Sequence, residues 1–83
     1  MNDIFRLDLE GYDKEYVRET LDGFLEGAPR RQRMMVEIRV SQVMFDRMAF
    51  EEDALGASYK GVPVLVADTG FDGTIEVVLG PLN

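Results

Sequence analysis

Residues 34–55 read MMVEIRVSQVMFDRMAFEEDAL, and the hydrophobic period changes within this stretch. Every second residue from Met34 to Val40 is apolar, which is the two-residue period of a half-buried strand. After Ser41 the apolar residues recur at three- and four-residue spacing, which predicts a helix over about Gln42–Leu55. The Ser41 hydroxyl is well placed to cap that helix, so the stretch is interpreted as a strand followed directly by a helix.

The segments on either side follow the same two periods. Upstream, alternation predicts a strand over about Ile4–Glu10, and an amphipathic stripe after an aspartate predicts a helix over about Lys14–Glu26. Downstream, alternation predicts strands containing Val62–Val66 and Ile75–Leu79. Residues 68–73 between them are rich in turn formers, which indicates a hairpin loop.

These elements define an expected fold of the α+β class. Their order is β-α-β-α-β-β, and right-handed crossovers would place both helices on one face of a four-stranded sheet, giving a two-layer sandwich. With 83 residues and no linker, we expect one small domain, 1–83.

The composition excludes several classes of function. The chain has no Cys and no His, so it offers no disulfide framework, thiol nucleophile or imidazole base. We therefore expect no enzymatic activity and no cofactor or metal. Sixteen acidic against nine basic residues give a net charge of −7, which disfavours direct nucleic-acid binding. No apolar run could span a membrane, and the expected location is cytoplasmic (the host cytoplasm if the protein is phage-encoded).

The loop beginning at Asp68 invites two sharper interpretations. Asp68-Thr-Gly70 is similar to the Asp-Thr-Gly signature of aspartic proteases, which need two carboxylates sharing a proton. A calcium loop would place oxygen ligands at fixed positions, but Gly70 and Leu79 fall where ligands are required. A turn, in which the aspartate accepts a hydrogen bond from its own backbone, explains the same residues and is preferred.

Two acidic groups are the candidate binding residues. One lies along one side of the first predicted helix and the other near the end of the second, and the set is Glu15, Glu19, Asp22, Glu26, Glu51, Glu52 and Asp53. Such carboxylates are found on ordinary solvated faces and on surfaces that bind a basic partner. We interpret them as a partner-binding surface.

The C-terminal segment resembles a strand–turn–strand signature in small proteins and capsid subunits of tailed bacteriophages. Gly61, Pro63, Val64, Gly73 and Thr74 carry the resemblance, which covers about a quarter of the chain. It implies a phage or mobile-element origin and transfers no catalytic residue.

Two functional hypotheses follow from these features. The first is a non-enzymatic acidic module, such as a phage-encoded inhibitor or adaptor, that docks on a basic, nucleic-acid-binding host protein. The alternative is a structural or assembly protein that self-associates as a homo-oligomer. It would do so through a sheet edge or through Phe45, Met48 and Phe50.

Overall fold

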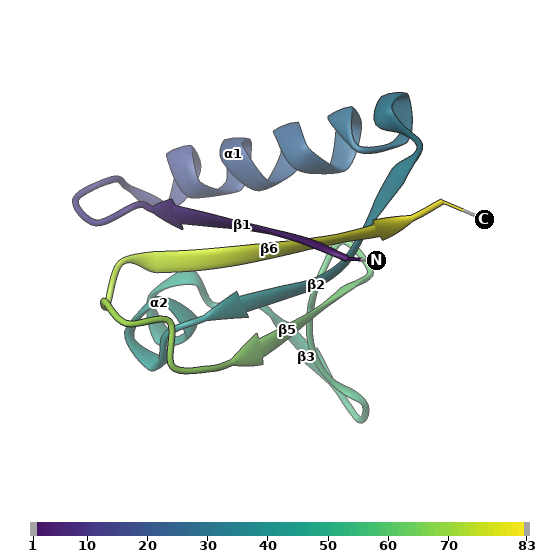
Figure 1. Ribbon diagram of the computed structural model, residues 1–83. Helices are drawn as coiled ribbons and strands as arrows, with labels where there is room; N and C mark the ends of the chain where they lie inside the picture. Colours follow the sequence, from purple (N-terminus) through teal and green to yellow (C-terminus); the bar gives the residue numbers. More distant parts are fainter. Residues whose placement is uncertain (1, 83) are drawn as a thin grey trace.

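The computed structural model describes residues 2–82 and shows an α+β fold with two α-helices (Figure 1). The elements follow in the order β1 (Asp3–Asp8), α1 (Lys14–Gly27), the 3₁₀ helix η1 (Pro29–Arg31), β2 (Arg33–Val40), α2 (Gln42–Met48), β3 (Glu51–Asp53), β4 (Gly56–Tyr59), β5 (Val62–Val66) and β6 (Thr74–Pro81). Side-chain caps begin both helices, because Asp13 accepts a hydrogen bond from Tyr16 and Ser41 accepts one from Met44.

The expected four-stranded sheet is wrong, because the sheet has six strands in the order β1-β6-β2-β5-β4-β3. The pairing of β2 with β5 is parallel, and the other neighbours are antiparallel. The two additional strands, β3 and β4, come from a region whose first part was expected to be helical. The predicted helix over Gln42–Leu55 is therefore also wrong, since α2 ends at Met48.

Backbone conformation at Ala49 explains why α2 is short. Ala49 has a φ of 51° in the left-handed region, which ends the helix and turns the chain back. The Phe50 ring then packs 6.2 Å from Phe45 and 6.2 Å from Tyr59, between ring centroids. Leu55, which the predicted helix placed on its apolar stripe, instead lies at the tip of the β3–β4 hairpin and is 98% exposed.

The predicted hairpin around residues 68–73 is also wrong, because β5 and β6 are not paired and β2 lies between them. The connecting loop instead crosses the end of β2. The Ala67 amide donates to the Val40 carbonyl at 2.9 Å, and the Ser41 hydroxyl donates to the Asp72 carbonyl at 2.5 Å. The four successive residues 77–80 of β6 are buried, which requires cover on both faces and favours a place inside the sheet rather than at its edge.

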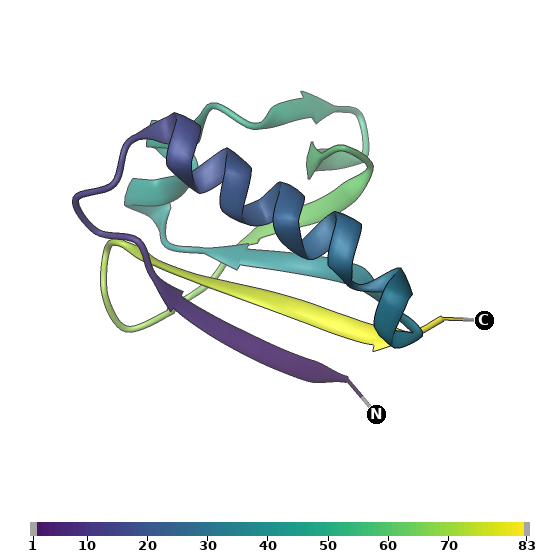
Figure 2. The same cartoon turned by 90° about the horizontal axis from the view of Figure 1, so that it is seen from above.

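One hydrophobic core joins both helices to the sheet. Its most buried members come from α1 (Val17, Leu21), α2 (Met44, Met48), β2 (Ile38, Val40) and β6 (Ile75, Val77). Figure 2 shows α1 lying obliquely over the sheet, with β1 along the outer edge beyond the part that α1 overlies. The β3–β4 segment lies on the other side of α1, which leaves one recess on each flank of this helix.

Candidate functional site

The first recess is a cleft of about 390 Å³ between α1 and the β3–β4 segment. Four carboxylates line it, and they are Glu15, Glu19, Asp22 and Glu51. Arg18 and Lys60 are the basic residues of the lining. Spacings of four and three residues along α1 place Glu15, Glu19 and Asp22 on one side of the helix, whereas Glu51 comes from β3. The fold thus gathers charges from two segments that are far apart in the sequence.

Aromatic rings form the apolar part of the cleft. Phe50 and Tyr59 meet edge to face, with ring centroids 6.2 Å apart and an interplanar angle of 82°. Met48, which is buried, lines the cleft beside them. An apolar wall next to carboxylates is suited to a cation that also has a flat or aliphatic surface, such as an arginine or lysine side chain.

Asp22 fastens the two walls of the cleft together. Its Oδ1 atom accepts a hydrogen bond from the Tyr59 hydroxyl at 2.7 Å and an ion-paired hydrogen bond from Lys60 Nζ at 2.8 Å. The hydrogen bond from Lys60, followed by that from Tyr59, lowers the pKa of Asp22. Burial, reinforced by the hydrogen bond to Asp22, raises the pKa of Tyr59 to about 12. Asp22 is therefore an ionised carboxylate whose charge is balanced by Lys60, and it has a structural role in the wall of the cleft.

The charges of the other three carboxylates of the cleft are not balanced by an ion pair of this kind. Within residues 2–82, no ion pair joins a Lys or Arg side chain to Glu15, Glu19 or Glu51. These three are exposed, and Glu15 and Glu19 stand one helical turn apart, where like charges repel by a few tenths of a kcal/mol. A cation entering the cleft would relieve this repulsion.

The structure divides the predicted acidic residues into two groups. Glu15, Glu19, Asp22 and Glu51 line the cleft, whereas the other three predicted residues do not. These are Glu26, Glu52 and Asp53, all of them exposed. Glu51–Asp53 form a strand and not the end of a helix, which corrects the context in which they were predicted. The Asp53 carboxylate accepts a hydrogen bond from the Leu55 amide at 2.8 Å, so it supports the β3–β4 turn.

Sequence reasoning missed Phe50, Tyr59 and Lys60 as residues of the cleft. A local signal for part of this region was present. Lys60 and Gly61 both have positive φ, 48° and 87°, and form the two-residue turn that joins β4 to β5. Glycine is the favoured second residue of such two-residue hairpin turns, and Gly61 at this position would have placed Tyr59 on a strand.

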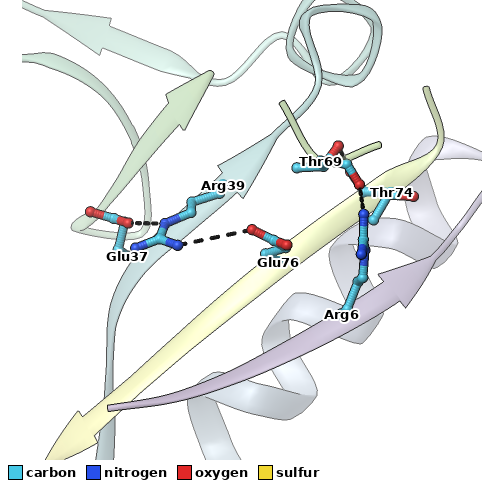
Figure 3. A network of polar contacts seen from close by, with 6 residues as sticks. All are labelled: Arg6, Glu37, Arg39, Thr69, Thr74 and Glu76. Carbon is cyan, nitrogen blue, oxygen red and sulfur yellow. Dashed lines mark hydrogen bonds and ion pairs between the residues drawn. The ribbon is translucent and has the colours of Figure 1, made fainter. Parts of the chain in front are cut away.

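A second group of polar side chains occupies the sheet face opposite α1 (Figure 3). Arg39 lies between two carboxylates, with Nε 2.5 Å from Glu37 Oε2 and Nη1 4.0 Å from Glu76 Oε1. The hydrogen bond to Glu37 raises the pKa of Arg39. Arg6 reaches across β6 and donates to the Thr69 carbonyl, which fastens the loop between β5 and β6. Each charge in this group has a structural contact, so we assign it a structural role.

The loop at Asp68 has the geometry of a turn. The Asp68 carboxylate accepts a hydrogen bond from the Gly70 amide at 3.0 Å, and Gly70 has a φ of 96°. Over residues 2–82, no group of three or more acidic side chains is arranged to hold a metal ion. Neither helix in that range is long and apolar enough to cross a membrane.

Comparison with known proteins adds no further assignment. The chain matches no protein-family model, no curated protein and no solved structure.

Proposed function

We propose that this protein is a non-enzymatic, acidic protein-binding module that docks on a basic segment of a partner protein through the cleft beside α1. The observation that carries the proposal is the convergence of Glu15, Glu19 and Glu51, from two distant segments, around one recess. Carboxylates on a merely solvated surface have no reason to gather around a concavity with aromatic walls. An inhibitor or adaptor of a nucleic-acid-binding protein would use such a surface.

A single cationic side chain of the partner is the expected occupant of the cleft. Its charge would lie among the three carboxylates that lack a basic partner, and its stem or guanidinium plane would rest against Phe50 and Tyr59. The chain already contains a weaker version of this contact, since Lys60 Nζ lies 5.6 Å from the centre of the Tyr59 ring.

The overall charge supports the same kind of partner. A net charge of −7 repels nucleic-acid phosphates and accelerates encounter with a basic surface. The carboxylates along one side of α1 are also attracted to the kind of basic surface that a partner uses for nucleic acid. For this reason we propose competition with nucleic acid, rather than binding to it, as the biological effect.

Fluorescence anisotropy of a labelled peptide that carries a single arginine between neutral residues tests the cleft directly. Two pairs of matched substitutions separate the cleft from the rest of the acidic surface. Glu19→Gln and Glu51→Gln remove charges in the cleft, whereas Glu26→Gln and Glu52→Gln remove charges outside it. Each substitution in the cleft should weaken binding about threefold to tenfold, which corresponds to about 0.7–1.4 kcal/mol.

The control substitutions should change binding little, and the wild-type affinity should fall as salt concentration rises. Replacing the arginine of the peptide with glutamine should abolish binding. Equal effects of all four substitutions would show that only the net charge matters, and the cleft would then lose its assigned role. Affinity that does not change with salt would contradict electrostatic docking altogether.

A further inference from the structure

Strand β1 forms one edge of the sheet and has a strand neighbour on one side only. It pairs with β6 through six residues, Asp3 to Asp8, and no strand among residues 2–82 pairs with its other side. The opposite edge, β3, has three residues, all of them acidic. Short, charged edges resist further pairing, but a six-residue edge strand with exposed apolar side chains is a template for another strand.

The second recess of the molecule is a groove beside this edge. It has a volume of about 430 Å³ and is lined mainly by apolar or small residues of β1, α1 and β6. Phe5 of β1 is 39% exposed in it and packs against Phe24 at a centroid distance of 5.6 Å. On α1, a Cβ atom added to Gly23 or Gly27 would meet no atom within 4 Å, so this flank of the helix is open.

Charge distinguishes this flank of α1 from the flank that faces the cleft. The carboxylates of α1 that line a recess are Glu15, Glu19 and Asp22, and all three lie in the cleft. The charged residue that lines the groove beside β1 is Arg31. On β1 itself, Asp3 is paired with Arg33 at 3.4 Å. A chain with a net charge of −7 therefore has one flank on which a second copy would meet little like charge.

We propose that two copies of this chain associate through β1, antiparallel and about a two-fold axis, so that their sheets become continuous. The proposal goes beyond the docking cleft and does not depend on it. The two-fold axis is perpendicular to the sheet, which keeps the helices of both copies on the same face. Side chains that lie directly opposite each other in an antiparallel pair are on the same face of the sheet. The axis therefore lies midway between the two copies of one residue, which is directly opposite itself, and the register is named by that residue.

The axis could lie at any of several residues of β1, each giving a different register, and the length and composition of β1 select one of them. An axis at Ile4 or at Leu7 pairs only three strand residues of each copy, because β1 runs from Asp3 to Asp8. Beyond it, the Leu9 amide already donates to the Gly73 carbonyl at 2.8 Å.

Two registers that pair five strand residues remain. An axis at Arg6 places two arginines directly opposite each other, which is unfavourable. An axis at Phe5 pairs residues 3–7 of each copy without opposing like charges and brings the two Phe5 rings together over the groove.

Cross-linking between two single-cysteine variants tests this register, because the natural chain has no cysteine. In the proposed register Ile4 lies opposite Arg6 of the second copy, whereas an axis at Arg6 would place it opposite Asp8. All three side chains lie on the sheet face away from α1, and Phe5 stays intact in each variant. A mixture of Ile4→Cys and Arg6→Cys proteins should therefore give a disulfide-linked heterodimer on mild oxidation. The mixture of Ile4→Cys and Asp8→Cys should give much less.

Sedimentation equilibrium of the full chain measures the association itself. Phe5→Ala should weaken dimerisation about tenfold. Phe71→Ala, which removes a phenylalanine that is 71% exposed in the β5–β6 loop, should leave it unchanged. Because the contact combines backbone hydrogen bonds with apolar rings, raising the salt concentration should not dissociate the dimer.

Three results would overturn the proposal. They are a monomer throughout the micromolar range, dimerisation that is equally sensitive to Phe5→Ala and Phe71→Ala, and preferential cross-linking of Ile4→Cys with Asp8→Cys. Peptide binding in the cleft should survive Phe5→Ala, so failure of the dimer and failure of the docking function give different results.

Discussion

Replacement of Ala49 by glycine tests the structural feature that most changed the expected fold. Ala49 has φ and ψ of 51° and 55°, is exposed, and stands where α2 ends. An L-residue in this conformation costs about 1–2 kcal/mol, whereas glycine adopts it freely. Glycine also loses about 0.5–1 kcal/mol through the greater entropy of its unfolded state. The substitution should therefore raise the free energy of unfolding by about 0.5–1 kcal/mol.

Ala54→Gly is a matched control for this prediction. Ala54 is also exposed and follows β3, but it is not among the residues of positive φ. At this position only the entropic loss remains, so the control should lower the free energy of unfolding by about 0.5–1 kcal/mol.

Urea unfolding followed by circular dichroism measures both changes. With a slope of about 1 kcal/mol per molar urea for a chain of this size, the midpoint should rise by about 0.5–1 M for Ala49→Gly and fall for Ala54→Gly. If both substitutions lowered the midpoint equally, Ala49 would not occupy the left-handed region. A helix continuing towards Leu55 would then be the better description.

The remaining predictions concern Tyr59 and two glycines. Folding raises the pKa of Tyr59 from 10.0 to about 12, so its neutral form stabilises the fold below pH 10, and this contribution is lost as the pH rises towards 12. Absorbance titration should show one native tyrosine that ionises near pH 12 and is missing from Tyr59→Phe, whose stability should also fall less over this interval. Gly73→Ala should destabilise the fold by about 1–3 kcal/mol, because the new Cβ atom would lie 2.5 Å from Glu10 Cβ and 2.6 Å from its backbone. Gly23→Ala, with free space and a helical backbone, should instead stabilise it by about 0.5–1 kcal/mol. Thermal unfolding of both glycine variants checks the signs, and a neutral Gly73→Ala would contradict the close packing of this loop on Glu10.

Features with a local chemical signature were predictable from the sequence. The Asp13 and Ser41 caps begin the helices at Lys14 and Gln42, as predicted, because a short side-chain acceptor needs only the next turn of backbone to act. The alternation of residues in β2 and β6 predicted both strands for a similar reason. Side chains of a strand face alternate sides of the sheet whatever strand lies beside it. The exception is the irregularity between Met35 and Glu37 in the pairing with β6, where Met35 is buried and Met34 is 41% exposed.

The residues after Met48 could not be assigned by the same reasoning. Phe45 and Phe50 both belonged to the apolar stripe predicted for residues 42–55, because Phe50 follows Val43 by seven positions and precedes Ala54 by four. Their rings do meet, but they do so because the chain reverses at Ala49, and Tyr59 completes the cluster from β4. The pattern correctly indicated that these residues share an apolar environment, but it could not specify the backbone path that brings them together.

The candidate site shows the same division. Sequence spacing was sufficient to place Glu15, Glu19 and Asp22 on one side of a helix. It could not show that Glu51 joins them, that Asp22 is bound by Tyr59 and Lys60, or that Glu26 lies outside the cleft.

Acidic character, the absence of thiols and imidazoles, and the capped helix starts are written in the residues themselves and need no tertiary contact. Strand order, the end of α2 and the composition of the cleft depend on pairing between residues far apart in the chain. Such pairing is decided by which arrangement buries the most apolar surface while satisfying the backbone. That choice is a property of the whole packed molecule, and no short stretch of its sequence contains it.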